Sequence, residues 1–193
     1  MEKDEQKLTK RIFTKSNSNI IDNRISALFS EMVYKHSKVL VMKFIIRYPQ
    51  DYELETQTNL LLSKFFHSLC KYYKNKNIEI KYLATREHLT SDHPHYHLAI
   101  FIDGNKIQSN YAIHKKANSI WQKLVNSERD GLISKVSTEY NSKEMVFKYE
   151  KSSDVNQQYF NFILENLKYL SKIYSKDKTP RNTNVYVCSR LKK

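Results

Sequence analysis

Two strand-like segments, at residues 78–87 and 95–102, constrain the fold of this chain more than any other feature. Both are rich in apolar, β-branched and aromatic residues, and the turn-forming segment His88–Pro94 separates them. So short a connection can join antiparallel neighbours, whereas two parallel strands need a crossover of about a dozen residues or more. The two segments therefore predict a β-hairpin and a sheet that is at least partly antiparallel.

Helical and strand patterns follow one another on both sides of this hairpin. We expect helices at residues 18–36, 56–73, 112–125 and 154–175, and further strands at residues 38–48, 132–136, 145–149 and 183–190. Short units of this kind around an antiparallel pair predict an α+β fold, in which helices pack on one small central sheet.

The length of 193 residues predicts a single domain. We assign it to residues 18–193, starting with a leading helix at 18–36, and expect the polar residues 1–17 to form a flexible tail. The first residues are charged, unlike a signal peptide, and no apolar run reaches the length of about 18 residues that a membrane span needs. We therefore expect a cytoplasmic protein without membrane contacts, with Cys70 and Cys188 as free thiols.

The chain is strongly basic, because 33 Lys and Arg residues outnumber 20 Asp and Glu residues and give a formal net charge of +13. Such an excess favours a polyanionic partner, most often a nucleic acid. Lysine, asparagine and isoleucine are all abundant, as they are in proteins encoded by AT-rich genomes, so part of the charge reflects composition. The charge alone therefore leaves the nature of the partner open.

The segment His95-Tyr96-His97 carries the most informative side chains. In a strand, residues i and i+2 point to the same face, so His95 and His97 lie side by side while Tyr96 points into the core. Glu87 ends the preceding strand, across the turn, and can complete a set of two histidines and one carboxylate. This donor set suits Mn²⁺ and accepts Mg²⁺ with additional water molecules. The sequence therefore predicts a divalent metal site at these three residues.

Two other histidines compete for this assignment. In a strand, His93 would point to the same face as His95 and His97, but Pro94 places it in the turn, so we expect it not to bind the metal. His88 is an alternative to Glu87 as the third ligand, although in the strand it would point to the opposite face. The simpler alternative, that all of these are ordinary surface histidines, makes their alternation beside an apolar run a coincidence.

The helix expected from residue 154 holds one tyrosine apart from its apolar stripe. At about 100° per residue, the stripe consists of Phe160, Ile163, Leu164, Leu167, Ser171 and Tyr174. Tyr169 lies on the opposite side with Lys172 one turn away, where a lysine can meet a phosphate or favour a phenolate. Tyr169 then faces away from the histidines unless the helix lies obliquely or breaks near Lys168. A surface tyrosine among solvated lysines is the simpler alternative.

These motifs resemble those of the HUH endonucleases. His95-Tyr96-His97 matches their His-hydrophobic-His motif, Tyr169-Leu170-Ser171-Lys172 matches their Tyr-x-x-Lys motif, and Glu87 stands where many replication initiators carry a third ligand. Over roughly residues 18–190 the chain most closely resembles the inovirus-type replication initiators, the YagK/YfjJ-like family. The resemblance implies an RRM-like HUH nuclease fold, with one antiparallel sheet of about five strands and flanking helices.

The same resemblance implies an activity. Tyr169 would nick single-stranded or hairpin DNA at a replication origin, with help from Lys172, and form a 5′-phosphotyrosine while a free 3′-OH primes rolling-circle replication. Tyr174 lies on a different helix face, unlike the second tyrosine of two-tyrosine members, so we expect a single-tyrosine enzyme of a phage, plasmid or integrated element. The sequence has no GxxxxGK[ST] motif, so a host helicase and polymerase are the expected partners.

Three other functions stay open at the level of sequence. A member of the family could bind DNA and regulate replication without cutting it. A transposase-like relative would use the same chemistry to move DNA. An RRM-like RNA-binding module would bind through its aromatic residues and would need no metal.

Overall fold

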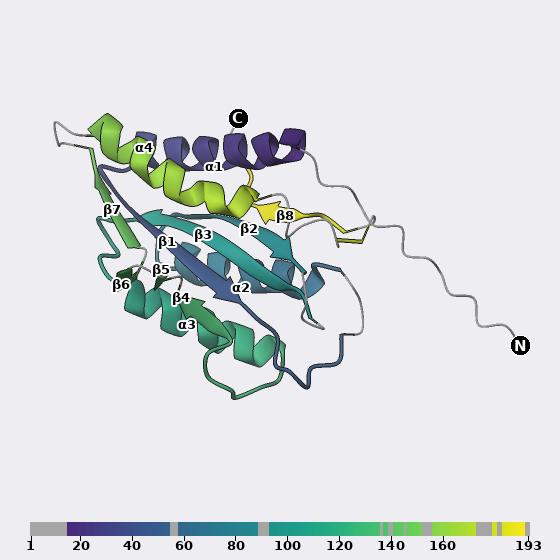
Figure 1. Cartoon of the computed structure of the whole chain (residues 1–193). Helices are drawn as coiled ribbons and strands as arrows, with labels where there is room; N and C mark the ends of the chain where they lie inside the picture. The colour runs from purple at the N-terminus through teal and green to yellow at the C-terminus, as the bar shows by residue number, and fades with distance from the viewer. Residues whose placement is uncertain are drawn as a thin grey trace, which may run out of the picture.

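The computed structural model describes residues 15–54, 58–88, 93–135, 137–138, 141–144, 146–151, 156–172, 179–180 and 183–191. In the described residues, four α-helices lie around a central sheet (Figure 1). The helices are α1 (Lys15–Lys35), α2 (Leu60–Lys74), α3 (Asn110–Leu124) and α4 (Asn156–Leu167), followed by the 3-10 helix η1 (Lys168–Ser171). The strands are β1 (Lys38–Ile46), β2 (Ile80–Glu87), β3 (His95–Asp103), β4 (Ile133–Lys135), β5 (Ser137–Thr138), β6 (Asn141–Glu144), β7 (Val146–Glu150) and β8 (Tyr186–Cys188).

The central sheet contains six antiparallel strands, in the order β4-β1-β3-β2-β8, with β7 also paired to β1. β4 pairs with the end of β1 and β7 with its beginning, so these two strands share one edge of β1 and the sheet is five positions wide. The predicted hairpin is present as β2 and β3, in a register that pairs Glu87 with His95 and Thr85 with His97. The predicted α+β fold with one antiparallel sheet of about five strands is confirmed.

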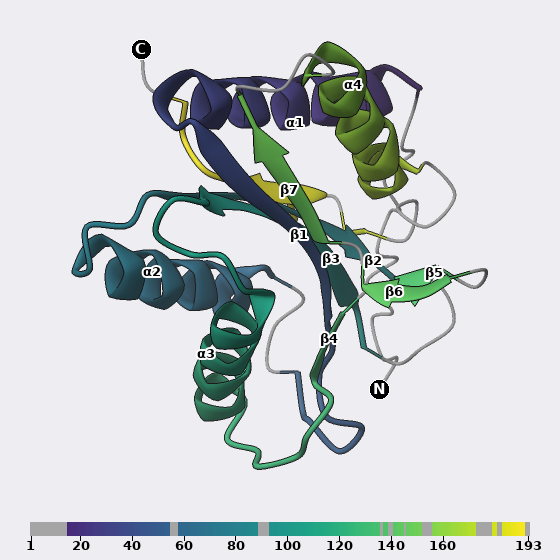
Figure 2. The same cartoon turned by 90° about the vertical axis from the view of Figure 1, so that its left-hand side faces the viewer.

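Helices cover both faces of the sheet (Figures 1 and 2). α1 and α4 lie on one face, and α2 and α3 lie on the other. Side chains that alternate along β1 and β3 fill two separate cores, one beneath each pair of helices. A strand buried on both faces needs apolar residues at nearly every position, which explains the sequence KVLVMKFII of β1. Lys43, in the middle of that sequence, is therefore unusual, because it is a charged residue in a buried strand position.

The predicted length of the last helix is wrong. The sequence pattern extends it to about residue 175, but the α-helix ends at Leu167 and continues as the 3-10 helix η1. Side chains from other elements bind carbonyl groups at this end: Lys43 Nζ donates to the Asn166 carbonyl at 3.0 Å, and Ser18 Oγ donates to the Ser171 carbonyl at 2.9 Å. These bonds satisfy carbonyls that the end of a helix leaves without intrahelical partners. Tyr174 lies outside the described residues.

Several element boundaries differ from the expected ones. α1 begins at Lys15, before the expected start at residue 18, and β8 spans only Tyr186–Cys188 instead of 183–190. Residues 1–14 lie outside the described part, so the flexible tail stays a prediction. Cys70 and Cys188 are both free. Among the described residues, no helix has the length and apolar character needed to cross a membrane.

Candidate active site

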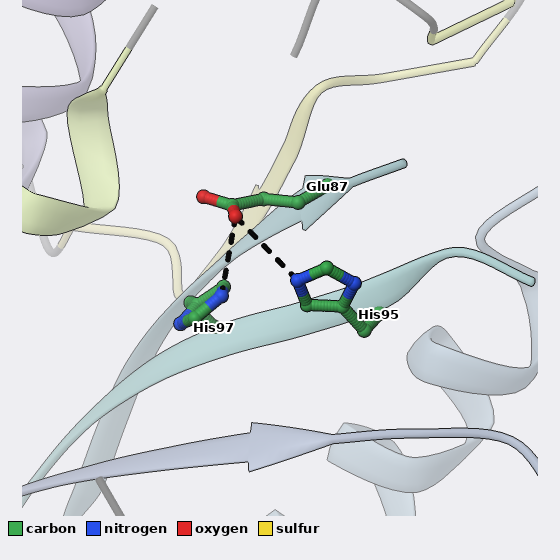
Figure 3. Close-up of side chains that lie close together, drawn as sticks. All are labelled: Glu87, His95 and His97. Carbon is green, nitrogen blue, oxygen red and sulfur yellow. Dashed lines mark ion pairs between the residues drawn. The ribbon is translucent and has the colours of Figure 1, made fainter. Parts of the chain in front are cut away.

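Glu87, His95 and His97 converge at one end of the β2–β3 hairpin (Figure 3). Glu87 Oε2 lies 3.2 Å from Nε2 of His97 and 3.5 Å from Nε2 of His95. One potential ligand atom from each residue lies within 4.8 Å of the other two. The antiparallel register produces this cluster, because Glu87 pairs directly with His95 and because His95 and His97 point to the same face.

The cluster is largely shielded from solvent. Glu87 is 3% exposed and His97 is 5% exposed, while His95 is partly exposed at the rim. Two imidazole nitrogens and a carboxylate form a mixed nitrogen and oxygen donor set that fits a divalent cation such as Mn²⁺ or Mg²⁺ and leaves coordination positions for substrate oxygens. A buried carboxylate also offsets the cost of placing a cation in a shielded site. The residues of the predicted metal site are thus together, and their chemistry fits a metal ion.

The competing histidines do not join this cluster. His93 Nε2 donates a hydrogen bond to the Tyr52 carbonyl at 2.6 Å, and its ring lies 6.0 Å from that of Tyr48. Among the described residues, the group able to hold a metal ion contains neither His93 nor His88.

The opposite face of the hairpin supports the cluster. Arg86 alternates with Glu87 along β2 and is fully buried on the other side of the sheet. Its Nη1 atom donates to the Tyr96 hydroxyl at 3.3 Å and lies 3.5 Å from the Asn59 side-chain oxygen. Sequence reasoning did not identify Arg86 or Asn59. The pairing ties the end of the hairpin to the start of α2 and restrains the strand positions that carry the ligands.

Tyr169 lies beside the candidate metal cluster formed by Glu87, His95 and His97. The centroid of its ring is 5.1 Å from that of His97, and the rings are inclined at 62°. The change from α-helix to 3-10 helix begins at Lys168, immediately before Tyr169. A helix break near Lys168 was one of the two arrangements that could bring the tyrosine to the histidines, and it is the one found.

Two lysines flank the phenol ring. Lys172 Nζ lies 3.9 Å from the ring centroid, over its face. Lys43 Nζ lies 5.9 Å from the same centroid and comes from β1, and sequence reasoning missed it. Burial lowers the pKa of the Lys43 ammonium to about 8, and the nearby charge of Lys172 adds to the shift. The signal that could have found Lys43 is a lysine in the middle of a strand whose other central residues are apolar.

Comparison with known proteins adds one relationship. The sequence model of the YagK/YfjJ C-terminal domain family matches residues 2–188 of the chain. No curated protein matches it significantly. The match extends over all the residues that form the metal cluster and over Tyr169, Lys172 and Lys43.

Proposed function

Because the chain belongs to the YagK/YfjJ C-terminal domain family, we propose that it is an HUH endonuclease, which nicks and rejoins single-stranded DNA at a specific site through a 5′-phosphotyrosine. The proposed reaction starts rolling-circle replication of a phage, plasmid or integrated element, as in the inovirus-type initiators that the sequence resembles. The observation that carries the proposal is the position of the Tyr169 ring, 5.1 Å from a histidine of the candidate metal cluster.

The proposed nicking step is a phosphoryl transfer to Tyr169. The phenolic oxygen attacks the scissile phosphorus, and the bond from phosphorus to the 3′ oxygen breaks. The phenol proton leaves to solvent, and the departing 3′ oxygen takes a proton from solvent. The 5′ phosphate is then esterified to Tyr169 and the other product ends in a free 3′-OH. Attack of a 3′-OH on the phosphotyrosine reverses the step and rejoins the strand. Lys172, over the phenol ring, is placed to stabilise the negative charge that develops.

A divalent cation, when bound by Glu87, His95 and His97, would supply Lewis-acid polarisation of the phosphate. The three residues hold donor atoms within 4.8 Å of one another on strands β2 and β3. The ring of His97 also contacts the ring of Tyr169, which supports the proposal that a metal ligand and the nucleophile act on the same phosphate. This arrangement favours a cutting enzyme over a DNA-binding regulator or an RNA-binding module, because neither of those needs a tyrosine beside a metal cluster.

Single-stranded or hairpin DNA at an origin is the proposed substrate. The net charge of +13 supports attraction of a polyanion, and exposed aromatic residues such as Tyr111 offer surfaces for base stacking. A host helicase and polymerase would supply strand separation and synthesis.

Formation of a covalent adduct tests the proposal. Purified protein is incubated with labelled single-stranded DNA from its own replicon and Mn²⁺ or Mg²⁺, and the products are separated on a denaturing gel. We expect a protein-linked band that requires metal and disappears in Tyr169→Phe and in His97→Ala. Tyr34→Phe, which changes a tyrosine that is 83% exposed, serves as the control and should retain the band. A band that survives in Tyr169→Phe would assign the nucleophile elsewhere, first to Tyr174, and no band with any substrate would contradict the proposed nuclease.

A further inference from the structure

Lys43 and Lys81 are equally buried, each with 7% of its surface exposed, but their surroundings differ. Lys81 Nζ forms an ion pair with Glu31 at 3.0 Å and donates to the Arg190 carbonyl at 2.8 Å. Lys43 Nζ donates to the Asn166 carbonyl and lies near the Tyr169 ring, and none of the described carboxylates forms an ion pair with it. A buried ammonium without a carboxylate partner is costly, so its retention calls for an anion that arrives from outside the chain.

The position of Lys43 identifies where that anion would be. β1 is paired with β3, and Lys43 lies opposite Ala99, one alternate position along β3 from His97 and on the same face of the sheet. The Lys43 ammonium and the Lys172 ammonium both lie within 6 Å of the centroid of the Tyr169 ring, at 5.9 Å and 3.9 Å. The mutual repulsion of two lysines at such distances falls when an anion binds near both.

We propose that Lys43 is a second phosphate-binding lysine of this site, which contacts a non-bridging oxygen of the phosphate that is transferred to Tyr169. This inference rests on the proposed function and assigns a catalytic contact to a residue outside the Tyr-x-x-Lys motif. Lys172 is exposed and can approach the phosphate from solvent, whereas Lys43 is buried and approaches it from strand β1 of the sheet. The two ammonium groups would then hold the phosphate from two sides while Tyr169 attacks. The lowered pKa of Lys43 agrees with this role, because a phosphate would restore the charge that burial disfavours.

A structural role is the competing explanation for Lys43. Its hydrogen bond to Asn166 supports the end of α4, and a variant that only lost this support would misplace Tyr169. The two roles predict opposite effects on stability. Removal of a structural bond lowers the melting temperature, whereas removal of an ammonium that is buried without a carboxylate leaves it unchanged or raises it.

The test compares wild type with Lys43→Met, Lys43→Arg and the control Lys38→Met. Lys38 lies on the same strand, is exposed and pairs with Glu150, so its replacement removes the same charge without touching the site. Three quantities are measured at pH 7: the rate of covalent adduct formation, the melting temperature, and the affinity for inorganic phosphate in a ³¹P NMR titration with Mg²⁺ present.

We expect Lys43→Met to slow adduct formation on the order of 100-fold, the loss typical of one donor to a developing oxyanion. It should also weaken phosphate binding without lowering the melting temperature, Lys43→Arg should restore part of both functions, and Lys38→Met should match wild type. A wild-type rate in Lys43→Met would overturn the inference, and so would equal losses in both Lys43 variants together with a lower melting temperature. If wild type forms no adduct at all, the proposed nuclease fails, and the phosphate titration alone then decides: weaker binding in Lys43→Met than in Lys38→Met supports the phosphate site, and equal binding overturns it.

Discussion

The ring of Tyr169 contacts the ring of His97, although one residue lies in the 3-10 helix after α4 and the other lies near the start of the central strand β3. The contact depends on the 3-10 turn at Lys168–Ser171, which changes the direction of the side chain relative to the preceding α-helix. The chemistry proposed for this site would therefore need two separate pieces of structure, a hairpin that holds the candidate metal ligands and a helix end that presents the phenol.

The first prediction concerns metal affinity. His97→Ala and Glu87→Gln each remove a donor atom from the buried cluster, so isothermal titration should show Mn²⁺ affinity reduced by at least about 10-fold. His67→Ala changes an exposed histidine on α2 and should bind Mn²⁺ as wild type does. Tyr169→Phe should also retain Mn²⁺ affinity, since the phenol is not a member of the cluster. Unchanged affinity in both ligand variants would remove the metal site from these residues.

A second prediction separates Lys172 from its neighbour Lys168. Lys172 lies over the Tyr169 ring, whereas Lys168 is exposed and forms an ion pair with Glu165. We expect Lys172→Met to slow adduct formation by about 10-fold to 100-fold, because it removes a charge beside the developing oxyanion. Lys168→Met removes the same charge from the same 3-10 turn and should leave the rate unchanged. Equal rates for the two variants would show that the effect of Lys172 is not local.

The third prediction is a dependence of stability on pH that originates at Lys43. Its pKa is about 8 in the folded protein, against a usual value of 10.5, so between these pH values the unfolded chain binds the proton and the folded chain does not. The free energy of unfolding of wild type should therefore rise from pH 8 to pH 10.5. The difference between the folded and the unfolded pKa of Lys43 corresponds to a total rise of about 3 kcal/mol over this range.

Urea denaturation of wild type and Lys43→Met across this range measures the effect. The variant should gain most over wild type at pH 7, where wild type carries the buried charge, and the advantage should shrink toward pH 10.5. If the difference in the free energy of unfolding between the two proteins stays constant at all pH values, Lys43 is not the origin of the pH dependence.

A fourth prediction concerns the ion-pair network around Glu31, at the other end of the sheet. Burial alone would raise the pKa of Glu31, but hydrogen bonds from Lys35 and Lys81 hold it below its usual value. Glu31→Gln leaves the Lys81 ammonium buried without its partner and should reduce the free energy of unfolding by about 3 kcal/mol at pH 7.

The stabilisation from Glu31 is present above the pKa of the unfolded carboxyl and is lost as the pH falls through the lower folded value. The difference between wild type and Glu31→Gln in urea denaturation should therefore shrink below about pH 4, near the pKa of an unperturbed glutamate. Glu53→Gln replaces an exposed glutamate and should match wild type throughout.

The grouping of Glu87, His95 and His97 could be predicted from sequence because all its geometry is local. Strand alternation places His95 and His97 on one face, and a short turn returns Glu87 to the same end. The end of α4 could not be predicted in this way, since the apolar period continues past Leu167. At that end, Ser18 and Lys43, which are distant in sequence, donate hydrogen bonds to backbone carbonyls.

Lys43 escaped prediction for a related reason. Strand parity gives the face on which a side chain lies, but it does not reveal which element covers that face. The role proposed for Lys43 depends on its contacts with the end of α4 and with Tyr169, which become visible only in the structure.

The way β4 and β7 share one edge of β1 has a consequence for self-association. The outer positions of the sheet are occupied by strands of three and five residues on that side and by the three residues of β8 on the other. Such short strands offer few consecutive backbone groups to an approaching chain, so they are poor templates for edge-to-edge pairing and fibril growth. The described edges of this sheet therefore offer few places at which a second copy of the chain could add a strand.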